Sequence, residues 1–220
     1  MTTLKEDLDA RRAEFLRTAP ADKAAAFQRG VDELAASGIA ARAPKAGDLA
    51  PDFAVANARG TEVRLSALLA RGPVVLTFYR GGWCPYCNLQ LRAYQAALPQ
   101  FKAAGATLVA ISPERPDDTL STAEKNALQF EVLSDARGEV GAAYGLYFEL
   151  SPELQALYNA GGNDLARRNA DGRWHLPIPA TFVIAPDGRV AAAFVDVEYR
   201  NRAEPADLLA ALNAATAKAG

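Results

Sequence analysis

Two thiols, Cys84 and Cys87, lie in the stretch "GGWCPYCNLQL" from Gly81 to Leu91, and they are the only cysteines of the 220-residue chain. The thiolate is the form of cysteine that acts as a nucleophile or a metal ligand. A pair separated by two residues can therefore exchange disulfides, attack a peroxide, bind a metal or remain inert in a core.

Metal binding and an inert role both fit the sequence poorly. A tetrahedral zinc site needs four ligands, and the chain offers two cysteines and one histidine, His175, besides carboxylates. A zinc site would be conceivable only if two copies of the chain shared it across a dimer interface. Inert cysteines rarely fall by chance at this spacing directly after a buried strand. The pair therefore predicts thiol redox chemistry with no metal or other cofactor. His175 alone indicates a surface or insertion residue as readily as a proton shuttle.

The elements around the pair place it at the start of a helix. "PVVLTFY" is a continuous apolar run typical of a strand buried on both faces, "NLQLRAYQAALPQFKAAG" reads as a helix, and "ATLVAIS" is a second buried strand. Such a strand–helix–strand unit joins two parallel strands of one sheet and predicts an α/β fold.

This position would activate a thiol. Unpaired N–H groups and a partial positive charge at the helix N-terminus stabilise a thiolate, and Pro85 suits the first helical turn. The i, i+3 spacing lets Cys84 and Cys87 bridge, with Cys84 nearer the loop and expected to be more exposed. Arg80, just upstream, adds positive charge and hydrogen-bond donors.

The remaining chain divides into an N-terminal extension, residues 1–44, and an α/β domain, residues 45–220. Residues 2–38 predict two peripheral helices separated at Pro20. Further expected elements follow along the chain: a hairpin over 53–65 turning on "NARG", a helix capped by Ser121 and Glu124, a strand over 130–134, a helix over 139–145, an insertion over 146–176, a hairpin turning on "PDG" and a final helix over 204–218.

The composition and the N-terminal sequence exclude some classes of binding partner and predict where the protein is located. The chain has 24 Lys and Arg against 26 Asp and Glu, a net charge of -2 without a basic stripe, which argues against nucleic acid or an acidic membrane surface. The N-terminus "MTTLKEDLDARRAEF" lacks an apolar signal region, and "PVVLTFY" is too short to span a bilayer. We expect a soluble cytoplasmic protein, a compartment where a close cysteine pair is more often catalytic than structural.

A second informative stretch, "PIPATFVI", places Pro179 directly before an apolar strand. A proline here is either a cis-proline, which is a deliberate feature where it occurs, or simply the residue that opens a strand.

Taken together, these motifs resemble the thioredoxin superfamily and, more closely, the peroxiredoxin-like branch of the alkyl-hydroperoxide reductase and thiol-specific antioxidant family. The resemblance covers "GDLAPDF", "PVVLTFYRGGWCPYC", "TLVAISPE", "FEVLSD" and "IPATFVIAPDGRV", roughly residues 45 to 215. It implies a thioredoxin-like fold with a central mixed sheet flanked by helices. The N-terminal helical extension lies outside the resemblance and, like the insertion before the last hairpin, is predicted from the residues themselves.

The resemblance leaves the attacking sulfur open. The peroxiredoxin pattern P-x-x-x-T-x-x-C, laid on "RGGWCPYC", puts Arg80 at the proline, Cys84 at the threonine and Cys87 at the attacking cysteine. The family's later arginine falls near Pro179, where this chain has none, so Arg80 would replace it. Trp83 and Cys84 instead resemble the W-C of thioredoxins, "CPYC" matches glutaredoxins, and Pro179 resembles the thioredoxin cis-proline, which makes Cys84 the attacker.

The implied function is a thiol-dependent peroxidase. It would reduce hydrogen peroxide or organic hydroperoxides through a sulfenic acid and a Cys84–Cys87 disulfide, recycled by thioredoxin or another thiol reductant. The alternative is a thiol-disulfide oxidoreductase with Cys84 as the nucleophile, and a non-catalytic redox sensor is a third. A homodimer is an open possibility.

Overall fold

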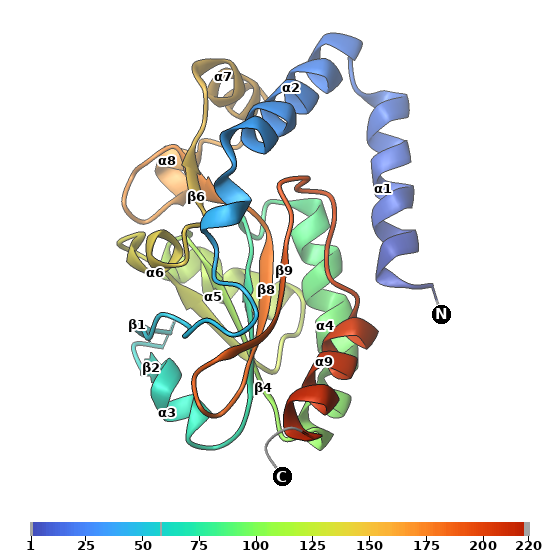
Figure 1. The fold of residues 1–220 in the computed structure, drawn as a ribbon. Coiled ribbons are helices and arrows are strands. Elements are labelled where there is room, and N and C mark those ends of the chain that lie inside the picture. Colours follow the sequence, from blue (N-terminus) through green and yellow to red (C-terminus); the bar gives the residue numbers. More distant parts are fainter. Residues whose placement is uncertain (1, 58, 218–220) are drawn as a thin grey trace.

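The computed structural model describes residues 2–57 and 59–217, and a five-stranded mixed sheet forms its centre (Figure 1). From edge to edge the strands are β5 (Glu131–Ser134), β4 (Thr107–Ser112), β3 (Val74–Phe78), β8 (Ala180–Ile184) and β9 (Val190–Val195). β3, β4 and β5 run parallel, whereas β8 is antiparallel to both β3 and β9. The predicted strand–helix–strand unit is β3, α4 and β4.

The other elements surround this sheet. They are α1 (Leu4–Thr18), α2 (Ala21–Ser37), the 3₁₀ helix η1 (Ile39–Arg42), β1 (Ala54–Ala56), β2 (Glu62–Arg64), α3 (Leu65–Leu69), α4 (Pro85–Ala103), α5 (Pro116–Lys125), α6 (Glu139–Ala143), β6 (Tyr147–Glu149), α7 (Pro152–Ala160), α8 (Leu165–Arg168), β7 (His175–Pro177) and α9 (Pro205–Ala217). No helix among the described residues is long and apolar enough to cross a membrane.

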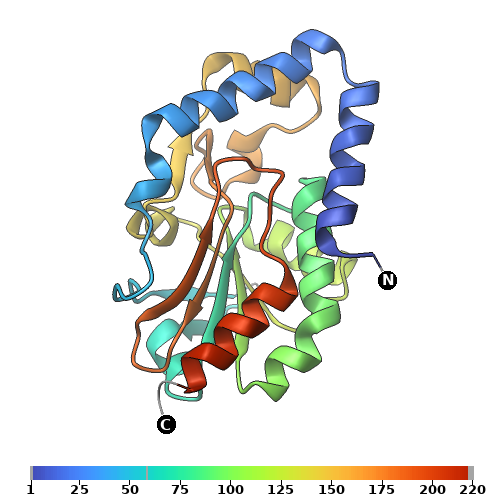
Figure 2. The same ribbon diagram turned by 45° about the vertical axis from the view of Figure 1, so that its right-hand side comes forward.

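Side chains alternate between two cores along each central strand. Val74, Leu76 and Phe78 of β3 join one apolar cluster with α3 and α6. Val75 of β3 joins the other, with apolar side chains of α4, α9 and α1. Figure 2 shows α4 and α9 lying over that second face. Burial on both faces explains why the central strands are continuous apolar runs in the sequence.

The N-terminal helices pack along the outside of the molecule. α1 lies beside α4, and α2 crosses one end of the structure toward α7 (Figures 1 and 2). Leu4 and Leu8 of α1 are buried against the α4 side of the core. The prediction of two helices separated at Pro20 is confirmed, and Gly38 ends α2 in the left-handed conformation. The domain boundary at residue 44 stays a prediction.

One predicted helix start was wrong. The cap that we assigned to Ser121 lies inside α5, where the Ser121 hydroxyl donates to the Asp117 carbonyl. α5 begins at Pro116 instead, because proline fits the first turn and two acidic residues follow it there. Two other predicted features reach beyond the described residues: Ala58 in the "NARG" turn and Lys218 at the end of the final helix.

The segment predicted as an insertion, 146–176, is an ordered unit. Its β6 pairs with β7 in a small antiparallel sheet, and α7 and α8 lie between them. Tyr158 of α7 is buried in a satellite apolar cluster that also contacts Trp83. The insertion therefore reaches the loop that carries the cysteines.

Candidate active site

A short loop after β3 turns the chain so that Cys84 becomes the N-cap of α4 and Pro85 its first residue. Gly81 has φ 147°, and a side chain at Gly82 would meet the Thr122 hydroxyl at 1.9 Å, so only glycine fits both positions. The loop is fixed at Gly82, whose N–H donates to Glu114 over 2.8 Å and whose carbonyl accepts from Asn88 over 2.8 Å. The cysteine pair thus lies at the strand-to-helix junction where the sequence places it.

Both thiols are free and buried, with exposed fractions of 1% for Cys84 and 0% for Cys87. The expected difference in exposure is very small, because both side chains are almost completely buried. Trp83 and Tyr199 pack against the cluster that contains both sulfurs, and Tyr199 lies edge-on to Tyr86 at 5.8 Å. The loop after β9, which carries Tyr199, thus covers the first turn of α4.

The sulfur of Cys87 receives several hydrogen-bond donors. The Arg202 guanidinium lies 3.2 Å from it, and the Arg80 backbone N–H and the Cys84 thiol also donate to it. Burial by itself would raise the pKa of Cys87, but the bond from Cys84 and the charges of Arg202 and Arg80 outweigh burial and lower that pKa well below its usual value. Cys87 is therefore set up as a thiolate.

The environment of Cys84 acts in the opposite direction. Burial and its interaction with the Cys87 thiolate raise the pKa of Cys84 well above the usual value. The two guanidinium groups lower it only in part. Because the sulfurs share one site, they titrate as a pair, and the Arg202 contact favours the negative charge on Cys87.

Arg202 was missed in the sequence, and it comes from the loop between β9 and α9. Its Nε donates to Gln90 over 2.7 Å, and its Nη1 donates to the carbonyls of Tyr199 and Asn201. Gln90 is itself buried and donates to Thr77 of β3 over 2.9 Å. Each nitrogen of the guanidinium therefore has a partner, and the side chain is held against Cys87.

Arg80 is buried in a group of rings that we call the aromatic cage, formed by Trp83, Tyr158 and Tyr199. Its guanidinium carbon lies 4.4 Å from the centre of the Tyr199 ring, and its Nη2 donates to the Tyr158 hydroxyl. Its Nε has no partner among the described residues. A buried cation without a carboxylate partner favours a nearby anion, and the Cys87 thiolate supplies one.

The cage is closed on its outer side by Phe27 of α2, which stands edge-on to Tyr158 at 5.4 Å. A cavity of about 30 Å³ between them reaches Arg80. Such a volume holds about one or two water-sized molecules.

Removal of the Phe27 ring should expose the cysteines. We expect Phe27→Ala to raise the rate at which iodoacetamide alkylates the pair about tenfold, because a 1.4 kcal/mol lower opening free energy gives that factor. Leu16→Ala, on the exposed side of α1 with 56% of Leu16 accessible, is the matched control. Equal alkylation rates in wild type and Phe27→Ala would show that α2 does not limit access.

Two other residues predicted for the site are Trp83 and Pro179. Trp83 lies edge-on to Tyr158 at 5.4 Å. Pro179 precedes β8, and no peptide bond among the described residues is cis, so the cis alternative is not the one present. A trans proline instead opens the strand. Together with Arg202, Pro179 lines a surface cavity of about 310 Å³.

His175 lies in β7, away from the residues that contact the thiols. Its ring stacks on Tyr147 at 4.3 Å, and its Nε2 lies 3.2 Å from the Asp171 carboxylate. Burial lowers the pKa of His175, partly offset by Asp171. Within the part of the chain that the structure describes, no group of three or more His, Cys, Asp or Glu side chains could hold a metal ion.

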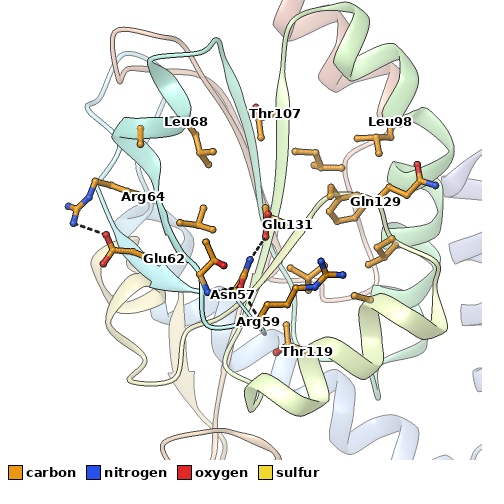
Figure 3. A pocket seen from close by; sticks show the side chains of 18 of the residues that line it. Asn57, Arg59, Glu62, Arg64, Leu68, Leu98, Thr107, Thr119, Gln129 and Glu131 are labelled. Carbon is orange, nitrogen blue, oxygen red and sulfur yellow. Dashed lines mark hydrogen bonds and ion pairs between the residues drawn. The ribbon is translucent and has the colours of Figure 1, made fainter.

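A larger groove, of about 650 Å³, lies away from the thiols (Figure 3). It runs between the β1–β2 hairpin with α3 on one side and the later half of α4 with α5 on the other. Arg64 pairs with Glu62 at 3.2 Å, and Asn57 donates to Glu131 over 3.0 Å. Neither cysteine lines it, so its size does not make it the candidate active site.

The sequence matches a protein-family model over most of the α/β domain. The model of the AhpC/TSA family matches residues 46–193. The chain belongs to this family. The expectation of a peroxiredoxin-like member of the thioredoxin superfamily is therefore confirmed, as is the expectation of a thioredoxin-like fold.

Individual relatives support the same assignment. One Mycobacterium tuberculosis protein named as a putative peroxiredoxin is 35% identical over 102 residues, which cover 46% of this AhpC/TSA chain and 66% of the relative. A second protein of that organism with the same kind of name is 30% identical over 152 residues, which cover 69% of this chain and 85% of the relative. Peroxiredoxin Bcp of Escherichia coli is 27% identical over 157 residues, 71% of this chain and 89% of the relative. The crystal structure of peroxidoxin BcpB from M. tuberculosis matches with a TM-score of 0.62 and 28% identity, covering 78% of this chain and 97% of that one.

Proposed function

We propose that this AhpC/TSA-family chain is a thiol-dependent peroxidase that reduces hydrogen peroxide or organic hydroperoxides, with Cys87 as the attacking residue. The observation that carries the proposal is the set of donors on the Cys87 sulfur: Arg202, the Arg80 backbone and the Cys84 thiol. These contacts favour the thiolate, which is the nucleophile. Peroxiredoxin relatives support the peroxidase class.

The first step is attack on the peroxide. The Cys87 thiolate forms an S–O bond as the O–O bond breaks, which gives a sulfenic acid and an alkoxide or hydroxide that then takes a proton. Negative charge moves from sulfur to the leaving oxygen during this step. The guanidinium groups of Arg80 and Arg202 flank the thiolate and stabilise that charge.

The second step uses the other cysteine. The Cys84 sulfur bonds to the oxidised Cys87 sulfur, water leaves, and the i, i+3 spacing on the first turn of α4 brings the sulfurs together. Thioredoxin or a similar thiol donor then restores the dithiol by exchange. The cavity beside Arg202 and Pro179 supports an approach of the thiol donor from that side.

A cytoplasmic location and a homodimer remain parts of the proposal.

The oxidoreductase alternative makes Cys84 the nucleophile. The raised pKa of Cys84, caused by burial and the neighbouring thiolate, counts against it. The peroxidase proposal is thus the better supported of the two.

The test is turnover with a recycling system. Purified protein with thioredoxin, thioredoxin reductase and NADPH should consume hydrogen peroxide and cumene hydroperoxide, whereas the double variant Cys84→Ser/Cys87→Ser should not. Dithiothreitol as the reductant separates a missing peroxidase from an unsuitable protein donor. If wild type matches the double variant with both reductants, the proposed function is wrong.

A further inference from the structure

Glu114 is a buried carboxyl group that contacts the active-site loop, although it follows β4 and lies far from the cysteines in sequence. Its side chain is 1% exposed, and its Oε2 accepts the hydrogen bond from the Gly82 N–H over 2.8 Å. A methyl group at Gly81 would lie 2.7 Å from Glu114 Oε1 and 2.3 Å from Trp83 Nε1. The carboxyl group thus faces the turn that leads into Cys84.

This carboxyl group has no cation to neutralise it. Among the described residues, no lysine, arginine or histidine forms an ion pair with Glu114. The indole N–H of Trp83, beside it, has no hydrogen-bond partner in the part of the chain that the structure describes. A buried carboxylate that accepts one backbone hydrogen bond is costly, so the neutral acid is favoured.

The charged groups that face Glu114 come from each neighbouring element. Burial raises the pKa of Glu114 to about 7, the Gly82 amide lowers it, Asp118 of α5 and Cys87 of α4 raise it, and Arg168 of α8 lowers it. Tyr79, after β3, stays neutral because burial and Glu114 raise its pKa well above the usual value. The Glu114 proton is therefore coupled to the charge on Cys87.

The peroxidase cycle consumes one proton. Attack and resolution together convert the Cys87 thiolate, the Cys84 thiol, the hydroperoxide and one proton into a disulfide, an alcohol and water. The two sulfurs are oxidised and the peroxide is reduced, by two electrons. Oxidation removes the thiolate charge, which is one of the two negative charges that, together with burial, raise the pKa of Glu114.

We propose that Glu114 is a positioning residue of this site that also stores the proton consumed in the cycle, so that the buried site holds one negative charge in both redox states. The charge lies on Cys87 in the dithiol and on Glu114 in the disulfide. Reduction of the disulfide by a thiol donor yields one proton, which returns to Glu114. This inference rests on the proposed function for its oxidant.

The test is proton uptake during a single oxidation. Reduced protein in weakly buffered solution with a pH indicator receives one equivalent of hydrogen peroxide. Wild type should take up few protons below pH about 7 and about one per peroxide above it, because Glu114 is already ionised there before oxidation. Glu114→Gln, which keeps an oxygen for the Gly82 N–H, should take up about one proton across that whole range.

Two controls make the result decisive. Asp117→Asn removes an exposed charge of the same helix, α5, that is not among the groups shifting the pKa of Glu114, and it should keep the pH-dependent uptake of wild type. Oxidised glutathione in excess as the oxidant has the same proton balance, so the test works even if the protein fails as a peroxidase. Matching circular dichroism and melting temperatures establish that Glu114→Gln folds. Coinciding uptake curves for wild type and Glu114→Gln would overturn the proposal.

Discussion

Cys87→Ser should lose peroxide consumption, whereas Cys84→Ser should stop after the first chemical step. Loss of a nucleophile removes the covalent path, so we expect the rate of peroxide consumption by Cys87→Ser to fall on the order of a thousandfold or more. Cys84→Ser keeps the Cys87 thiolate and its contact with Arg202. It should therefore form a sulfenic acid that no neighbouring thiol can resolve.

The measurement is to add one equivalent of peroxide to each variant, trap sulfenic acid with dimedone and locate the adduct by mass spectrometry. We expect the adduct on Cys87 in Cys84→Ser and little adduct on Cys84 in Cys87→Ser. Cys84→Ala is the matched control, because serine keeps a donor to Cys87 and alanine does not, so the thiolate pKa should be higher in the alanine variant. Rapid adduct formation on Cys84 instead would make Cys84 the attacker, as in the thioredoxin-like interpretation.

The parts of the fold that follow from local pattern were predictable. The apolar runs that form β3, β4 and β8 are buried on both faces of the sheet. A strand that is buried on both faces needs apolar side chains at nearly every position, so its sequence is a continuous apolar run. Helix starts at Pro85 and Pro152 follow from the fit of proline to a first turn. The junction that carries the cysteines could therefore be placed from sequence alone.

The electrostatics of the site depend on contacts that sequence does not reveal. Arg202 lies 115 positions from Cys87, in a polar loop without a periodic pattern. Glu114 stands out in the sequence only as the last residue of "TLVAISPE", although its carboxyl group returns to Gly82. The burial of both cysteines could not be predicted, because α2, α7 and the loop after β9 meet over the first turn of α4 only in the folded chain.

Arg202 favours the negative charge on Cys87, and its replacement should slow attack on peroxide by a factor of about 10 to 150. The guanidinium contacts the Cys87 sulfur at 3.2 Å, and a hydrogen bond to a charged group contributes about 1.5–3 kcal/mol, which corresponds to that factor. Because Arg202 lowers the pKa of Cys87, Arg202→Gln should raise it. The rate should then rise with pH through a higher midpoint than in wild type.

The rate constant for peroxide attack, measured over a range of pH in stopped flow, gives both effects. Arg202→Lys should not restore the rate, because the guanidinium uses its three nitrogens on Gln90, on two backbone carbonyls and on Cys87, and an ammonium group is a single point charge. Arg92→Gln is the control, since Arg92 lies exposed on α4, the helix that carries Cys87, and donates to Asn126 instead of to a sulfur. An unchanged pH–rate profile in Arg202→Gln would show that the thiolate is stabilised without this arginine.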